Sequence, residues 1–198
     1  ALSIGSEAAL GSSKIQKDIL SRGADELKLV MDDGKPFQDS LQTAKAIAEA
    51  VGTIGQYDLV LCGMGSSDLY FQEVGVQVGE LLGVPAQNNV TGIKPAGEGV
   101  LEVERTLEDE VEVLEVPLPA VLSVSSEINT PSVPAMRDIM RAGKKPVDKL
   151  DCQGGGEPSL RILQQLAPQQ QERRKELVEG DGEEAVDALV RFLKKEGF

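Results

Sequence analysis

The stretch at residues 58–62 constrains the fold more than any other part of the chain. Residues 58–62 (Asp-Leu-Val-Leu-Cys) form a short apolar run, which is typical of a strand buried on both faces of a parallel sheet. A glycine-rich turn at residues 63–67 interrupts the run, and apolar residues then recur at helical spacing over residues 71–82. This order of strand, turn and helix predicts one βα unit of a parallel sheet.

The segments before this unit repeat the same alternation. Residues 1–5 predict the end of a strand, residues 6–23 a helix, residues 26–31 a strand and residues 38–51 a second helix. We therefore predict an α/β fold, a parallel sheet flanked by helices. Because the chain opens within a predicted strand, we expect that further sequence belongs upstream of Ala1.

The next segment has a different pattern. Apolar and acidic residues alternate over residues 100–116, which predicts an antiparallel hairpin insertion with one apolar face and a change of register near Leu114. Residues 98–116 carry eight acidic side chains and one Arg, a charge of −7. This acidic face suits either a basic partner or water, and a solvated face is the commoner case. A buried strand at residues 119–124 and a short helix at residues 135–142 are predicted to follow.

The end of the chain differs from the rest. Residues 151–158 contain three consecutive Gly and a Pro, which mark a linker. From about residue 181 onward, apolar residues form one stripe of an amphipathic helix. We therefore divide the chain into an α/β domain at residues 1–150 and a linker with a C-terminal tail at residues 151–198. The stripe has to be buried against its own domain or against a partner.

Composition excludes several function classes. The 198 residues include 20 Lys and Arg against 33 Asp and Glu, a net charge of −13, which argues against nucleic acid and anionic membranes as partners. The absence of His excludes a Ser-His-Asp or Cys-His nucleophile and any His-bound metal. The sequence contains no run of about 18 apolar residues, so no membrane span is predicted. Any chemistry is therefore expected to come from a cofactor or a partner.

The turn at residues 63–67 is the first candidate site. A glycine turn that leads from a strand into a helix N-terminus presents free N–H groups and partial positive charge to an anion, usually a phosphate. The alternative is an ordinary βα turn in which Ser and Asp cap the helix. We expect Gly75 and Gly79 to serve close packing of the helix on the sheet, and Cys62 to belong to the core.

The second candidate is the segment at residues 127–145, where methionines lie among basic residues. Exposed Met-rich surfaces adapt to protein partners. Alternatively, Ile139 and Met140 belong to the core and the basic residues only complement the helix C-terminus. Taken alone, the segment favours the second alternative.

Four stretches together resemble the electron transfer flavoprotein β subunit, of the adenine-nucleotide α-hydrolase-like superfamily. The first is residues 58–63 with Asp68 and Val74-Gly75, and the second is Val103-Glu104-Arg105. The others are Leu-Pro-Ala-Val-Leu at residues 118–122 and Ile-Met-Arg-Ala-Gly-Lys-Lys-Pro at residues 139–146. The resemblance covers nearly the whole chain, but the family's opening strand–helix–strand region is absent. It implies that residues 1–150 form a Rossmann-like nucleotide-binding domain and that the tail at residues 151–198 wraps a partner.

The resemblance implies an electron carrier, not an enzyme with catalytic residues of its own. In this family an α subunit forms a heterodimer with the β subunit and carries the redox-active FAD. The β subunit holds AMP or, in electron-bifurcating members, a second FAD. The pair accepts electrons from flavoprotein dehydrogenases and passes them to a quinone reductase or a similar acceptor. The implied location is the prokaryotic cytoplasm, and no metal is implied.

Site residues are carried over by position. The nucleotide site comprises Ile4, Gly63, Met64, Gly65, Ser66, Ser67, Asp68, Gln72, Glu73 and Val74. Partner recognition falls on residues 125–146, and specifically on Met136, Ile139, Met140 and Arg141. Met136 stands where the family has an apolar Leu anchor.

The nucleotide loop departs from the usual family pattern. Val74 replaces a Thr hydroxyl, and Glu73 would disfavour a phosphate unless its side chain points away. Val74-Gly75-Val76-Gln77 resembles the Val-Gly-Pro-Gln of bifurcating members, so an NADH-oxidising β subunit with a second FAD is one alternative. A nucleotide-binding regulatory module of the universal-stress type is another, although it needs neither the tail helix nor the Met-rich segment.

Overall fold

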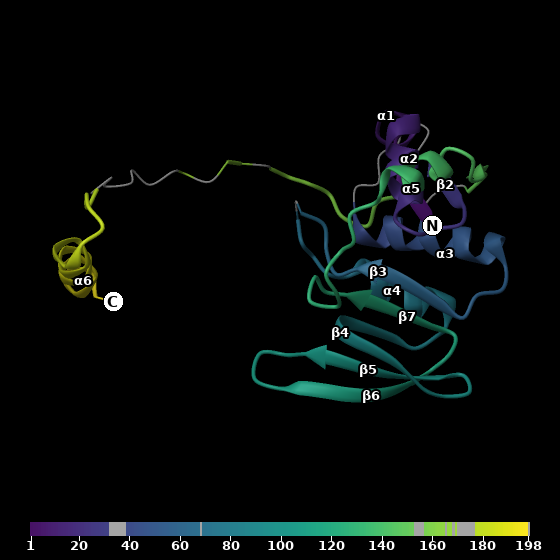
Figure 1. Ribbon diagram of the computed structural model, residues 1–198. Helices are drawn as coiled ribbons and strands as arrows, with labels where there is room; N and C mark the ends of the chain where they lie inside the picture. Colours follow the sequence, from purple (N-terminus) through teal and green to yellow (C-terminus); the bar gives the residue numbers. More distant parts are fainter. Residues whose placement is uncertain are drawn as a thin grey trace. The chain divides into compact units, whose positions relative to one another are not determined.

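The computed structural model (Figure 1) describes residues 1–31, 39–67, 69–152, 157–164, 166–167, 169 and 177–197. The chain divides into two compact units, Ala1–Arg161 and Ile162–Phe198, and each is described by itself. The predicted linker at residues 151–158 is described only at its ends, and Asp68 lies outside the described residues.

A three-stranded parallel sheet occupies one side of the first unit. Its strand order is β1-β2-β8, and Ser3 pairs with Leu29, which pairs with Lys149. The strands are β1 (Leu2–Gly5), β2 (Leu27–Met31) and β8 (Val147–Leu150). Sequence patterns predicted β1 and β2 but not β8, because β8 has four residues that are mostly exposed.

Helices α1 (Glu7–Leu10) and α2 (Ser13–Ser21) lie within residues 6–23, which were predicted to contain a helical stretch. The prediction is therefore confirmed, and the helical stretch comprises two helices. The N–H of Gly11 is bonded to the Glu7 carbonyl, which closes the first helix, and the hydroxyl of Ser12 accepts a hydrogen bond from the N–H of Lys14 and starts the second. Such a hydroxyl cap satisfies a donor that the helix leaves free.

The second sheet has five strands in the order β3-β7-β4-β5-β6. β3, β7 and β4 run parallel, whereas β4, β5 and β6 form an antiparallel meander. The strands are β3 (Leu59–Gly63), β7 (Ala120–Val124), β4 (Ala86–Gly97), β5 (Val100–Thr106) and β6 (Val111–Pro117). The predicted α/β fold is confirmed: the first sheet is parallel, and the second combines parallel strands with the antiparallel hairpin.

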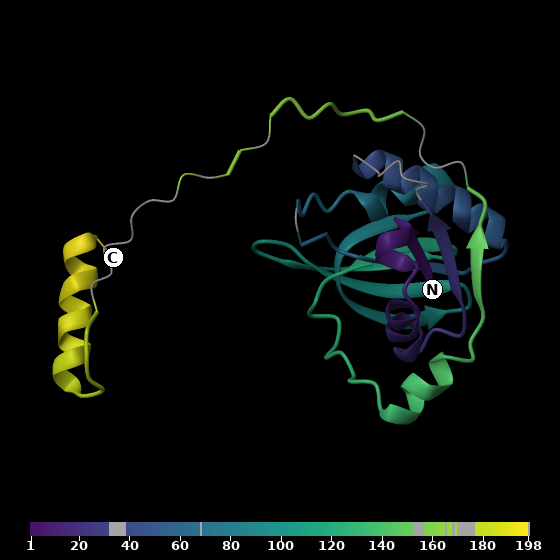
Figure 2. The ribbon, with the colours of Figure 1, turned by 90° about the horizontal axis from the view of Figure 1, so that it is seen from above.

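Helices α3 (Ser40–Ile54) and α4 (Val74–Leu82) pack against each other, and α4 lies on β7 and β4 (Figures 1 and 2). The side chains of β7 alternate between two core clusters. Val121 packs with Ala44 and Val78 from the helices, and Leu122 packs with Val90 and Val103 on the other face. This alternation follows from the two-residue period of a strand.

The hairpin β5–β6 is confirmed as antiparallel, but its predicted register change is not. Leu114 pairs with Val103 in an unbroken ladder that runs from Val100 to Thr106. Val111 and Val113, predicted on the apolar face, are each 60% exposed. The turn between the strands reverses the alternation, so that Glu112 lies inward and forms an ion pair with Arg105 (Nε–Oε2 3.4 Å).

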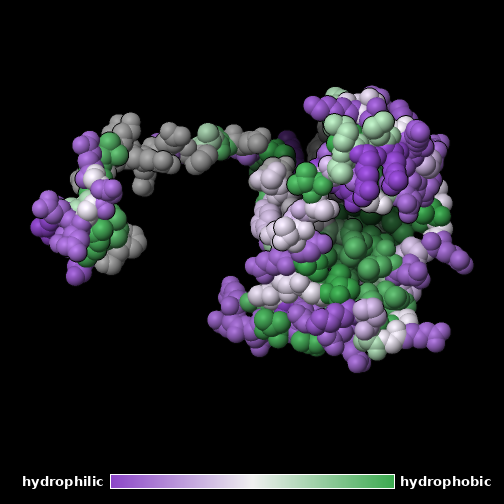
Figure 3. Space-filling model, in the orientation of Figure 1, coloured by the Kyte–Doolittle hydropathy of each residue, from purple (hydrophilic) through white to green (hydrophobic). Residues whose placement is uncertain are grey.

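An apolar groove of about 600 Å³ lies between β1 and β3. Each of these strands pairs on one side only among the described residues. Ile4 lines the groove together with Ile47 of α3 and Leu61 of β3, and Leu61 is 58% exposed. The prediction that residues 58–62 are buried on both faces is therefore wrong. Figure 3 shows a hollowed apolar area at the level of α3 and β3.

Helix α5 (Met136–Ala142) confirms the helix predicted at residues 135–142 and packs against α2. Only Ala142 is buried in it, among the side chains of α2 and β2. Met136 is 73% exposed and Met140 70% exposed. Ile139 is also exposed, so the interpretation that Ile139 and Met140 belong to the core is wrong.

The second unit contains helix α6 (Glu183–Glu196), which confirms the predicted amphipathic helix. Its first turn carries Glu183 and Glu184 and its last turn Lys194 and Lys195, which complements the helix dipole. The apolar stripe is exposed at Val186, Leu189, Val190 and Leu193. Among the described residues, no helix is long and apolar enough to cross a membrane.

Candidate functional site

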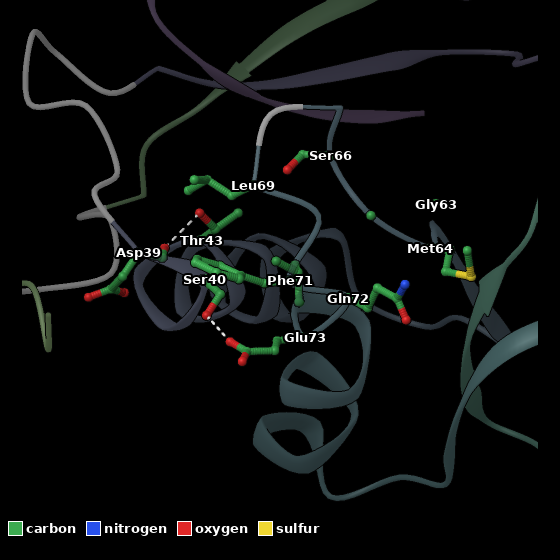
Figure 4. A pocket seen from close by; sticks show the side chains of 12 residues that line it. Asp39, Ser40, Thr43, Gly63, Met64, Ser66, Leu69, Phe71, Gln72 and Glu73 are labelled. Atoms are coloured by element: carbon green, nitrogen blue, oxygen red, sulfur yellow. Dashed lines mark hydrogen bonds between the residues drawn. The ribbon is translucent and has the colours of Figure 1, made fainter. Parts of the chain in front are cut away.

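The turn that connects β3 to α4 forms one wall of a pocket of about 280 Å³. The other wall is the first turn of α3, as Figure 4 shows. The lining residues are Asp39, Ser40, Thr43, Gly63, Met64, Gly65, Ser66, Leu69, Phe71, Gln72, Glu73 and Val74. The pocket therefore lies at the carboxyl end of a parallel strand and at the N-terminus of a helix, where open α/β sheets bind ligands.

Helix α4 begins three residues later than its apolar pattern predicted. Tyr70 and Gln72 adopt positive φ angles of 51° and 60°, so the chain between the strand and the helix is not helical. Phe71, predicted on the buried stripe, is 51% exposed. The helix starts at Val74, and the first N–H groups of any α-helix have no partner inside that helix. These N–H groups lie beside the pocket.

Glu73 occupies the N-cap position of α4 and lines the pocket, where its negative charge opposes the binding of an anion. Its Oε2 accepts a 2.6 Å hydrogen bond from the Oγ of Ser40 (Figure 4). It also accepts a 3.4 Å bond from the Nε2 of Gln77. The carboxylate thus points across to α3 and makes no hydrogen bond to the N–H groups of its own helix. The carbonyl-type oxygen of Gln77, Oε1, is buried and has no partner among the described residues.

Asp39 and Thr43 build the first turn of α3. The Oδ1 of Asp39 accepts a 2.7 Å bond from the N–H of Gln42, and the Oγ1 of Thr43 donates to the Asp39 carbonyl at 3.1 Å. Burial would raise the pKa of Asp39, but hydrogen bonds from Gln42, Ser159 and Leu160 outweigh it and hold that pKa below its ordinary value. The residue is therefore a buried carboxylate at the pocket's edge.

The glycines of this region have two roles. A Cβ atom at Gly65 would lie 2.8 Å from the ring of Tyr70, so the turn closes on that ring. A Cβ atom at Gly75 would overlap the Oγ of Ser123, and one at Gly79 would overlap the Cβ of Ala86. The prediction that Gly75 and Gly79 serve close packing on the sheet is confirmed.

The structure brings together most of the residues predicted for the nucleotide site. Those that line the pocket are Gly63, Met64, Gly65, Ser66, Gln72, Glu73 and Val74. Ile4 instead lines the apolar groove, which Gly63 and Val74 also border. Ser67 is exposed and does not line the pocket, and Asp68 lies outside the described residues.

Five lining residues were not predicted from the sequence: Asp39, Ser40, Thr43, Leu69 and Phe71. Asp39-Ser40-Leu41-Gln42 has the spacing of a capping box and so marks a helix start. That pattern places a helix N-terminus but says nothing about which loop it faces. Only the packing of α3 against α4 brings this turn to the pocket.

The pocket could hold an anionic ligand mainly through backbone groups. No Lys or Arg lines it in the described part of the chain, so partial positive charge comes from the N-termini of α3 and α4. The Glu73 carboxylate is engaged by Ser40, which leaves the N–H groups of α4 free to face an anion. The arrangement could therefore accept a small anionic group such as a phosphate.

The described part of this region holds neither a reactive thiol nor a cluster of metal-ligating side chains. Burial raises the pKa of the Cys62 thiol, which packs in the core cluster of α3 and α4, so the thiol is not an activated nucleophile. No cluster of three or more metal-ligating His, Cys, Asp or Glu side chains occurs among the described residues.

The sequence also matches a known family. A family model described as the electron transfer flavoprotein domain covers residues 1–153. The match includes both sheets, the pocket and helix α5, and it ends before the second unit.

Proposed function

Because this chain belongs to the electron transfer flavoprotein family, we propose that it is an electron carrier subunit that works with a flavin-bearing α subunit. In this proposal the pair takes electrons from flavoprotein dehydrogenases and delivers them to a quinone reductase or a similar acceptor. The family match over residues 1–153 is the observation that carries the proposal. The FAD, when bound, supplies the electron transfer itself.

This subunit's own contribution is to bind a nucleotide and to hold its partners. We assign the pocket between α3 and α4 to AMP or the adenine nucleotide part of a second FAD. The N–H groups at Val74 hold the phosphate, and the open backbone at Gly63 leaves room for it. Ser40 restrains the Glu73 carboxylate, which would otherwise repel that phosphate.

The exposed methionines of α5 form the proposed contact with a dehydrogenase. Met136, Ile139 and Met140 are exposed together with Arg141, so they present apolar and basic side chains to a partner. Methionine side chains fill irregular surfaces, which suits a carrier that meets more than one partner. The exposed apolar stripe of α6 is proposed to pack on the α subunit in the same way.

Coexpression with an electron transfer flavoprotein α subunit tests this proposal. We expect the two chains to copurify with flavin absorbance and with a nucleotide that can be released and identified. One flavin and one AMP per heterodimer would support the simple carrier. Two flavins would indicate the bifurcating alternative. A colourless monomer that binds a nucleotide but no α subunit would contradict both.

A further inference from the structure

The buried carboxylate of Asp39 connects two segments that are far apart in the sequence. Its Oδ1 caps α3 through the N–H of Gln42. Its Oδ2 accepts three further bonds, from the N–H of Ser159 at 2.6 Å, the Oγ of Ser159 at 3.0 Å and the N–H of Leu160 at 3.2 Å. Asp39 is 7% exposed, so these bonds are largely shielded from water.

We propose that Asp39 is a clamp that fixes the point at which the C-terminal segment leaves the first unit. The first unit ends at Arg161, directly after the two clamped residues. The family model ends at residue 153, so the clamped residues lie beyond the part of the chain that it describes.

The chemistry of the clamp requires a carboxylate. Ser159 and Leu160 present only donors to Oδ2, and an ionised oxygen accepts several donors at once. Hydrogen bonds to a charged acceptor are roughly twice as strong as neutral ones. An Asn at this position would cap α3 as well as Asp does, but its NH₂ group would meet N–H donors instead of accepting from them.

The clamp also adjoins the pocket. Asp39 and Ser40 are consecutive in the chain, and both line the pocket, where Ser40 holds Glu73. In Figure 4 the carboxylate of Asp39 points away from the other lining side chains. One turn of α3 thus positions the pocket wall on one side and residues 159–160 on the other.

Limited proteolysis of the full chain tests the clamp at the exposed residue Arg161, which follows it directly. In the Asp39→Asn variant we expect trypsin to cleave the Arg161–Ile162 bond about tenfold faster, the factor that corresponds to losing a hydrogen bond to a charged group. Amide exchange at residues 159 and 160 should rise by a similar factor. Cleavage after Arg22, far from the clamp, should keep its rate.

Two variants at Ser159, which donates to Asp39, test the clamp without altering α3, in case Asp39→Asn disturbs that helix. Ser159→Pro removes one N–H and the hydroxyl without touching the helix, and we expect the same acceleration at Arg161. Ser159→Ala removes only the hydroxyl and should have a smaller effect. Unchanged cleavage and exchange in both Asp39→Asn and Ser159→Pro would overturn the proposal.

Discussion

The backbone of Gly75 in α4 lies directly against the side chain of Ser123 in β7, with no room for a Cβ atom between them. The contact sets the distance between the helix and the sheet. It also places the N-terminus of α4 at the end of β3, where the pocket lies. A structural glycine therefore controls the geometry of the candidate site.

Replacing Gly75 should destabilise the protein by overpacking. We expect Gly75→Ala to lower the free energy of unfolding by about 1–3 kcal/mol, as measured by urea denaturation. In the Ser123→Ala background most of this loss should disappear, because the next atom, the Cβ of residue 123, is 3.3 Å from the new methyl carbon.

Gly52 in α3 provides the matched control, because a Cβ atom there meets no atom within 4 Å. Gly52→Ala should raise the free energy of unfolding by about 0.5–1 kcal/mol, since Gly is unfavourable inside a helix. Equal effects of the two substitutions would show that helix propensity, not contact with the sheet, governs Gly75.

Removing the charge of Glu73 should strengthen nucleotide binding. Glu73→Gln keeps an acceptor for Ser40 but takes a negative charge away from the helix N-terminus. We expect the affinity for AMP to rise about two- to fivefold in titration calorimetry. Glu80→Gln makes the same charge change in the last turn of α4 and should have little effect. A loss of affinity in Glu73→Gln would contradict the assigned phosphate position.

Met136, an exposed residue of α5, should affect the rate of electron transfer but not the cofactor content. We expect Met136→Asp to slow electron transfer from a dehydrogenase about tenfold or more, because a charge at an apolar contact is costly. Flavin content should stay the same. Val111→Asp places the same charge at another exposed apolar site, on β6, and should be neutral. Normal transfer rates in Met136→Asp would rule out α5 as the docking element.

The tail helix should be needed for assembly with the α subunit. Deleting residues 183–198 removes the exposed apolar stripe, and the yield of copurified heterodimer should fall. Leu189→Asp should act in the same direction, whereas Lys195→Asp, on the polar side, should not. Full copurification of the truncated chain would show that α6 is not the contact.

Asp39 should make stability depend on pH in the acid range. Hydrogen bonds to its carboxylate hold its pKa in the folded protein below the value of an unfolded Asp, about 3.9. The stabilisation is therefore complete above that value and is lost as the pH falls through the lower, folded pKa. The difference in unfolding free energy between wild type and Asp39→Asn should shrink over this range. A constant difference down to pH 2 would contradict the assignment.

Local patterns predicted the elements whose residues carry their own signal. The periodicity of α3, the alternation in β5 and β6 and the apolar run of β7 each specify one element. Gly83, with a φ of 68°, ends α4 directly after the last residue of its predicted apolar pattern. β4 was missed because Asn, Gly and Pro break its alternation, and pairing with β5 and β7 is what keeps it extended.

The sequence by itself determined the α/β class, the turn that leads into α4 and the family, because these depend on short stretches of neighbouring residues. Only the tertiary structure decided that Asp39 and Ser40 face that turn and that Ser40 holds Glu73. It also decided that Leu61 is exposed in a groove while Asp39 bonds to Ser159. The reason is physical: contacts between distant segments depend on how helices and strands pack, and no local pattern records that packing.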